Sequence, residues 1–129
     1  NAYGPRLNTS VAYRSVFGVF LEQKLANKPL TIVGNGEQTR DFVHVKDLVR
    51  VILKAASSRK IGKIYNVGSG QEVKVNKIAQ LIGGKKIRIP KRSVETDRSL
   101  ADITKVKRDL NWQPKITIEE GTKDLLNYY

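Results

Sequence analysis

The chain has 129 residues and a formal net charge of +12, from 24 Lys and Arg against 12 Asp and Glu. It has no cysteine, which excludes disulfides and thiol chemistry, and its one histidine leaves almost no ligands for a zinc or other metal site. No apolar run approaches the roughly 20 residues needed to cross a membrane, and no secretory leader pattern opens the chain. Length and composition predict a single domain over residues 1–129.

Helical and strand patterns alternate along the chain, which predicts an α/β fold. Residues 13–26 have apolar residues at helical spacing, and Pro29 prevents this helix from continuing. A β-branched strand is expected at Leu30–Val33, followed by turn chemistry at Gly34–Gly36. A second strand is expected at Asp41–Val45.

The next predicted helix begins at Asp47, whose carboxylate suits an N-cap. Its predicted apolar stripe contains Leu48, Val51, Ile52, Ala55 and Ala56. A buried strand is expected at Ile64–Val67, ended by Gly68–Gly70, and Asn76 is expected to cap a short helix.

The last third of the chain is predicted to hold one strand and two helices. The strand is Ile87–Ile89, and a helix from Asp102 or Thr104 runs through Leu110. Thr117 and Glu120 form a capping box for a final helix to about Tyr128.

Positive charge is concentrated in residues 83–115, where ten Lys and Arg stand against four Asp and Glu, a balance of +6. Clustered cations can neutralise nucleic-acid phosphates. Aromatic residues make up only 7% of the chain, and the one aromatic residue in this segment, Trp112, is expected to anchor the chain after its helix rather than to stack on a base. The pattern therefore favours a solvated lysine-rich face with a few arginines for a small anionic ligand.

The glycine-containing loops do not match a cofactor fingerprint. Gly68-Ser69-Gly70 follows the predicted strand at Ile64–Val67, but the third glycine of a dinucleotide loop would fall on Val73. We interpret this segment as a turn.

Arg40 is the strongest single candidate for ligand binding, because a strand can hold its planar guanidinium toward phosphate oxygens. The alternative is an ion pair with Glu37 or Asp41. Arg92 lies on a predicted loop, where either a ligand contact or a solvated charge is expected. The lone His44 is interpreted as a packed residue rather than a general base.

Five ordered segments carry a family resemblance, and they span residues 1–121: Asn1–Arg6, Pro29–Gly36, Thr39–Asp47, Ile64–Gly70, and Ser99–Asp102 with Leu110–Pro114. Together they resemble the C-terminal, substrate-binding portion of extended short-chain dehydrogenase/reductases, in particular the UDP-glucose 4-epimerase-like NAD-dependent epimerase/dehydratases. The resemblance implies a small mixed sheet with flanking helices, with the Rossmann cofactor half absent from this sequence.

The resemblance also implies roles for particular residues. Asn1 matches an asparagine that contacts the sugar diphosphate, and Arg40 and Arg92 match the two arginines that hold it. Ile32 and Val33 match positions that pack on or near the base, and Glu95 matches an acid that binds the ribose. Val94 departs from the family's usual glycine before that acid.

The family's catalytic parts are not in this sequence. Its glycine-rich NAD loop and its Tyr-x-x-x-Lys pair are expected upstream of Asn1, since no tyrosine here is followed by lysine four residues later. NAD is therefore expected in the complete enzyme and not on this chain alone, which carries no catalytic residue of its own.

The sequence as a whole predicts the nucleotide-sugar-binding part of a cytoplasmic epimerase (an isomerase) or dehydratase. It is expected to bind a UDP- or dTDP-sugar and to form a homo-oligomer or associate with a Rossmann half. The alternative is a non-enzymatic basic module for an acidic partner or nucleic acid.

Overall fold

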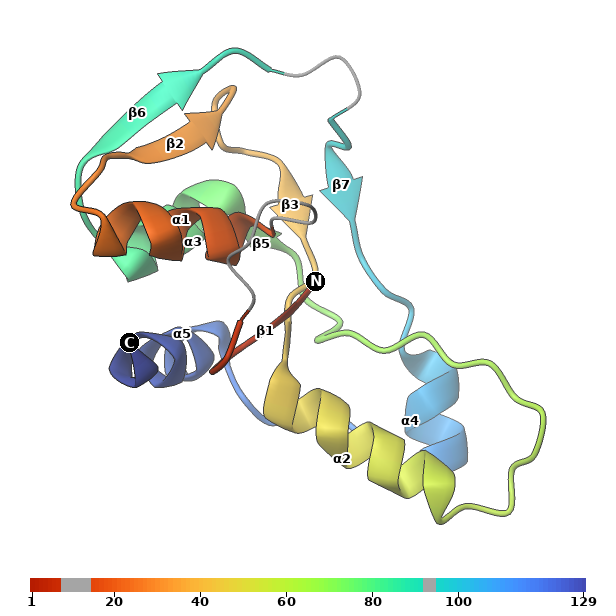
Figure 1. Cartoon of the computed structure of the whole chain (residues 1–129). Coiled ribbons are helices and arrows are strands. Elements are labelled where there is room, and N and C mark those ends of the chain that lie inside the picture. The colour runs from red at the N-terminus through yellow and green to blue at the C-terminus, as the bar shows by residue number, and fades with distance from the viewer. Residues whose placement is uncertain (8–14, 92–94) are drawn as a thin grey trace.

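The computed structural model describes residues 1–7, 15–91 and 95–129 (Figure 1). In chain order, the helices and strands are β1 (Ala2–Tyr3), α1 (Val16–Leu25), β2 (Leu30–Val33), β3 (Thr39–Arg40), β4 (Val43–His44), α2 (Val45–Ala56), β5 (Val73–Lys74), α3 (Val75–Ile82), β6 (Lys86–Ile89), β7 (Arg98–Ser99), α4 (Thr104–Leu110) and α5 (Ile118–Tyr128). The mixed α/β class predicted from the sequence is confirmed.

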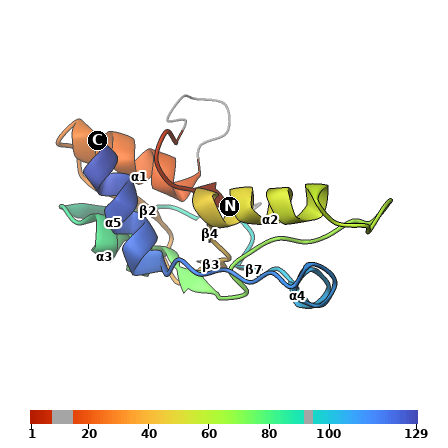
Figure 2. The same cartoon turned by 90° about the horizontal axis from the view of Figure 1, so that it is seen from below.

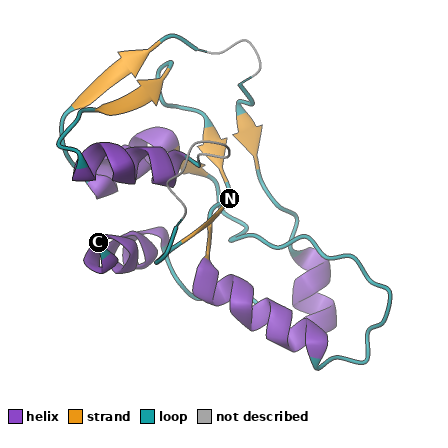
Figure 3. Ribbon diagram, viewed as in Figure 1, coloured by secondary structure: helices purple, strands orange, loops and turns teal. Residues whose placement is uncertain are grey.

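The described strands form small separate sheets joined by long loops (Figure 3). β2 and β6 pair in parallel from Leu30↔Lys86 to Val33↔Ile89. β3 lies between β5, which is antiparallel to it, and β7, which is parallel. β1 pairs in parallel with β4.

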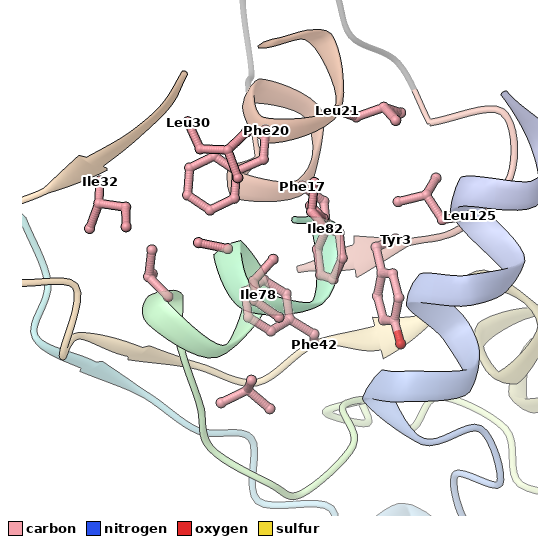
Figure 4. Close-up of a cluster of buried hydrophobic side chains, with 13 residues drawn as sticks. Tyr3, Phe17, Phe20, Leu21, Leu30, Ile32, Phe42, Ile78, Ile82 and Leu125 are labelled. Carbon is pink, nitrogen blue, oxygen red and sulfur yellow. The ribbon is translucent and has the colours of Figure 1, made fainter. Parts of the chain in front are cut away.

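The main core lies between α1, α3, α5 and the β2–β6 pair (Figure 4). Tyr3 stacks on Phe17 with ring centroids 4.3 Å apart, and Phe42 meets Phe17 edge-on at 5.2 Å. Ile78 is fully buried on α3, and Leu125 is fully buried on α5. This packing secures β1 and β4, and so positions the segment that carries Arg40.

A second core lies between α2 and α4, to one side of the first (Figure 2). Val51 of α2 and Val106 of α4 are buried there together with Ile103, Leu110 and Trp112. The sequence-based expectation that Trp112 anchors the chain after its helix agrees with this position.

The predicted buried strand at Ile64–Val67 is wrong. These residues form no strand, and Ile64 is 84% exposed. A β-branched run becomes a strand only when a neighbouring strand satisfies its backbone hydrogen bonds, and among the described residues none lies beside this one. The predicted apolar stripe of α2 is also corrected in part: Leu48 and Val51 pack in the second core, whereas Ile52, Ala55 and Ala56 are exposed.

Two predicted helix caps are also wrong. His44, not Asp47, is the N-cap of α2, and its Nδ1 accepts from the Lys46 N–H at 3.3 Å. Asp47 lies in the first turn, fully buried, and accepts from the backbone N–H groups of Lys115 and Ile116. Asn76 does not cap α3 but donates to the Asn35 carbonyl. In each case a distant partner replaces the expected local one.

The other predicted elements are present in the structure, some with different boundaries. The predicted strand at Asp41–Val45 is shortened to β4, because Val45 already begins α2. The helix predicted over 13–26 is α1, which starts after the N-cap Ser15, and the part before Ser15 falls outside the described residues. The capping box of Thr117 and Glu120 at α5 is confirmed. No described helix is long and apolar enough to span a membrane.

Candidate functional site

A cavity of about 230 Å³ lies between α1, β2 and the start of β3. Its apolar wall comes from Val16, Val19 and Phe20 of α1, together with Val33 and Ile89 of the β2–β6 pair. Its polar wall includes Asn1, Gln38, Arg40 and Glu95. Four of the six residues predicted from the sequence, Asn1, Val33, Arg40 and Glu95, therefore line one hollow.

Strand alternation decides which β2 residues reach this cavity. Successive strand side chains point to opposite faces, so Thr31 and Val33 face the cavity while Leu30 and Ile32 face the main core (Figure 4). Ile32 is only 4% exposed and does not line the cavity. Its place is behind the wall that Val33 forms.

The edge of β2 that does not pair with β6 is held by a glutamine of α1. Gln23 accepts from the Thr31 N–H at 3.0 Å and donates to the Thr31 hydroxyl at 2.8 Å. Gln38 donates to the Val33 carbonyl at 3.0 Å. These side-chain bonds fix the strand that forms the apolar wall, and the sequence pattern did not reveal them.

Arg40 forms an ion pair with Glu95, with Nη2 3.0 Å from Oε1. Its Nη1 also donates to the Thr39 carbonyl at 2.8 Å. The two side chains are 18% and 21% exposed, so both are largely screened from water. The structure thus joins two predicted site residues that are far apart in the sequence.

The two carboxylates proposed as local partners for Arg40 have other partners. Glu37 accepts from Lys74 at 2.6 Å and from Asn76 at 2.8 Å, and these bonds lower the pKa of the Glu37 carboxyl. Asp41 points away toward the loop at residues 68–70. The expected ion pair exists, but with Glu95 instead of Glu37 or Asp41.

The Asp41 carboxylate is a structural centre beside the site. It is buried and accepts from the Ser69 hydroxyl at 2.6 Å, the Gly70 N–H at 3.0 Å and the Ala101 N–H at 3.2 Å, in addition to the Ser69 N–H. A Cβ at Gly68 would lie 2.4 Å from Asp41 Oδ2, so only glycine fits there. The Gly-Ser-Gly segment is thus a nest for a protein carboxylate, a role that the sequence analysis missed.

A second hollow of about 460 Å³ shares Val33, Gln38 and Glu95 with the first and extends to Gly34 and Lys91. Lys91 is paired with Asp97 on the exposed rim. The two hollows are therefore adjacent, and Glu95 lines both of them. Arg92, the other predicted arginine, lies outside the described residues.

His44 is packed, as the sequence predicted. It is 1% exposed, and its Nε2 lies 3.3 Å from Asp124 Oδ2, which is a charge contact rather than an aligned hydrogen bond. Burial lowers the pKa of His44. No group of three or more potential metal ligands occurs among the described residues.

Comparison with known proteins identifies the family. The family model described as GDP-mannose 4,6 dehydratase matches residues 1–125. The chain belongs to this dehydratase family. It is 34% identical over 134 residues to a putative UDP-glucose 4-epimerase of Methanocaldococcus jannaschii, and 30% identical over 135 residues to the UDP-glucose 4-epimerase of Mycolicibacterium smegmatis.

Solved structures of related epimerases contain the same fold as this chain. UDP-glucose 4-epimerase of Thermotoga maritima with UDP-glucose superposes with a TM-score of 0.89 at 33% identity, over 99% of this chain and 43% of that one. UDP-glucuronic acid 4-epimerase of Bacillus cereus with UDP-glucuronic acid and NAD gives 0.86 at 28% identity, over 98% and 42%.

These matches confirm the predicted resemblance to the C-terminal part of extended short-chain dehydrogenase/reductase epimerases. The alignment with the Methanocaldococcus jannaschii protein includes 99% of this chain and 43% of that protein, and the alignment with the Mycolicibacterium smegmatis enzyme includes 100% and 43%. The chain therefore spans less than half the length of these relatives. The relatives are nucleotide-sugar epimerases and decarboxylases.

Proposed function

We propose that this chain binds the nucleoside diphosphate of a nucleotide sugar, as one unit of an NAD-dependent epimerase, dehydratase or decarboxylase. One observation carries the proposal: Asn1, Val33, Arg40 and Glu95 meet around a single cavity. An apolar wall opposite an arginine and a carboxylate suits a ligand with a flat base, hydroxyl groups and phosphates.

Arg40 is the proposed diphosphate ligand. Arginine carries five N–H donors, and among the described residues only the bonds to Thr39 and Glu95 occupy them, so three remain. A planar fork fixed at one end can bind phosphate oxygens with two parallel bonds. Arg92 and Asn1 are proposed to complete the diphosphate contacts.

The remaining roles follow from position. Val33 shelters the base, and Ile32 supports that wall from the core side. Glu95 is proposed to bind the ribose. The relatives solved with UDP-glucose and with UDP-glucuronic acid support a UDP-sugar as the ligand.

One observation among the described residues supports the proposal that NAD binds elsewhere. The Gly68–Gly70 segment, whose backbone N–H groups could bind an anion, already holds the Asp41 carboxylate. A second anion, such as a pyrophosphate, would be repelled there. We therefore propose that NAD binds to another part of a complete enzyme, where it would oxidise the sugar.

Titration of the purified chain with UDP by isothermal calorimetry tests the proposal. Arg40→Ala should weaken UDP binding at least 10-fold, since hydrogen bonds between charged groups contribute roughly 1.5–3 kcal/mol. Arg108→Ala is the matched control, because Arg108 is an exposed arginine on α4 that pairs with Asp109 and does not line the cavity. Equal effects of the two substitutions would refute the Arg40 assignment.

The same samples distinguish the basic-module alternative. Nucleic-acid binding weakens steeply with salt, with a logarithmic slope of about −0.9 per phosphate contacted on a duplex. We expect UDP binding to depend on salt far less than this. Tight duplex binding without measurable UDP affinity would favour the alternative.

A further inference from the structure

Another cavity, of about 280 Å³, lies between α2 and the segment that follows α4. It shares no residue with the cavity that contains Arg40. Six residues line it: Arg50, Lys54, Asn111, Trp112, Gln113 and Lys115. Each of the six side chains carries an N–H donor, and none of the six is a carboxylate. A lining of this kind suits an anion rather than a cation or an apolar group.

The indole N–H of Trp112 has no hydrogen-bond partner among the described residues. Trp112 is only 3% exposed, and its Nε1 atom is buried. A buried donor without an acceptor costs free energy, and such unpaired groups are uncommon in folded proteins. Because Trp112 lines the cavity, an acceptor bound there is the simplest way to satisfy this donor.

Among the residues that the structure describes, two of the three cations at this cavity lack a paired carboxylate. Arg50 is paired with Asp47, which is buried in the first turn of α2. The Lys54 ammonium donates to the Asn111 carbonyl at 2.9 Å, which holds it at the cavity without neutralising its charge. The Lys115 side chain has no hydrogen bond or ion pair within the described part of the chain. Like charges held close together repel one another, so a bound anion would relieve this repulsion.

We propose that this cavity binds a phosphate group, with its oxygens accepting from the Trp112 indole and from the ammonium groups of Lys54 and Lys115. A phosphate group carries a charge of about −1.5 to −2 at neutral pH, which matches two unpaired ammonium groups. Its oxygens accept strong charge-assisted bonds from several sides. A water molecule could satisfy the indole but would leave both positive charges unpaired. The inference is independent of the proposed nucleotide site.

Trp112 is the single tryptophan, so its fluorescence reports directly on this cavity. Titration of the chain with inorganic phosphate, at an ionic strength held constant with chloride, should change the emission until it saturates. Lys54→Gln and Lys115→Gln should each weaken binding about 3-fold, the effect expected of exposed charges. Lys107→Gln is the matched control, because Lys107 is an exposed lysine of α4 that does not line the cavity. It should bind phosphate as the parent does.

Trp112→Phe tests the indole donor itself, since phenylalanine keeps an aromatic ring without an N–H group. Its binding is measured by isothermal calorimetry in an Arg40→Ala background, so that phosphate in the first cavity does not contribute. It should bind phosphate roughly 10-fold more weakly than Arg40→Ala alone, as the loss of one bond to a charged group implies. Circular dichroism melting establishes that each variant is folded, and Lys115→Gln keeps the proposal testable if Trp112→Phe does not fold.

Three results would overturn the proposal: emission that does not saturate with phosphate, equal affinity of Lys115→Gln and the parent, or a fluorescence response that is lost in Arg40→Ala. The last result would place the phosphate in the first cavity. Glycerol 3-phosphate identifies the source of the group. Binding as tight as that of inorganic phosphate assigns the site to a phosphate ester, and much weaker binding assigns it to the free ion.

Discussion

Asp41→Asn should destabilise the fold strongly, although the two side chains have nearly the same shape. Each carboxylate oxygen of Asp41 accepts two bonds: Oδ1 from the N–H and hydroxyl of Ser69, and Oδ2 from the N–H groups of Gly70 and Ala101. Asparagine has one acceptor oxygen, so its side-chain NH2 group, itself a donor, would face two of these N–H or O–H donors. At a site that is 5% exposed, water cannot replace the lost acceptor.

The expected loss follows from the two broken bonds. A hydrogen bond to a charged group contributes roughly 1.5–3 kcal/mol, so the free energy of unfolding should fall by roughly 3–6 kcal/mol. Domains of this size are stable by about 5–15 kcal/mol in total. The expected loss is therefore a large part of the stability that such a domain has.

Urea unfolding followed by tryptophan fluorescence measures this loss. Trp112 is the single tryptophan and is buried in the second core, which includes Ile103 next to the Asp41 nest. Asp97→Asn is the control, because its carboxyl is 78% exposed and pairs only with Lys91 among the described residues; its midpoint should barely change. A loss below about 1 kcal/mol for Asp41→Asn would refute the reasoning that this carboxylate organises the loop.

Three further outcomes are expected. Burial lowers the pKa of His44, so the unfolded chain binds more protons than the folded one, and the free energy of unfolding should fall as pH drops from about 7 to 5. His44→Asn keeps a side-chain oxygen that can cap α2 and should make the urea midpoint depend less on pH. An unchanged pH dependence in this variant would contradict the prediction. The chain should self-associate through the exposed apolar residues of α2 and the loop after it, namely Val49, Ile52, Leu53, Ile61 and Ile64; Leu53→Glu should shift sedimentation toward monomer, and a monomeric parent at high concentration would contradict this. The 129-residue chain alone should neither retain NAD nor convert a UDP-sugar, because no tyrosine in it precedes a lysine by four residues; measurable turnover would refute that.

Short-range chemistry was readable from the sequence. The capping box of α5 joins Thr117 to Glu120 across three residues, and both of its backbone-to-side-chain bonds are present. The β2 strand and the α1 helix were predicted because their side-chain periodicity depends only on neighbouring residues. The candidate ligand residues Asn1, Val33, Arg40 and Glu95 were named from the family resemblance of the ordered motifs, and the fold brings these four residues to one cavity.

Misassigned partners came from contacts between distant residues. Asp47 is a good local cap by type, yet its carboxylate binds backbone groups 68 and 69 residues away. Ile64–Val67 has strand composition, but no composition can supply the neighbouring strand that its backbone requires.

The sequence by itself determined the helices, the N-terminal capping box of α5, the β2 strand and the family to which the chain belongs. Tertiary structure alone decided that Arg40 pairs with Glu95, 55 residues away, and that Asp41 faces the loop at Ser69 and not Arg40. The physical reason is that a charged side chain takes whichever partner the packed core brings within about 3 Å. Sequence neighbours such as Glu37 and Asp41 can pair with the Arg40 guanidinium only if the backbone turns their carboxylates toward it.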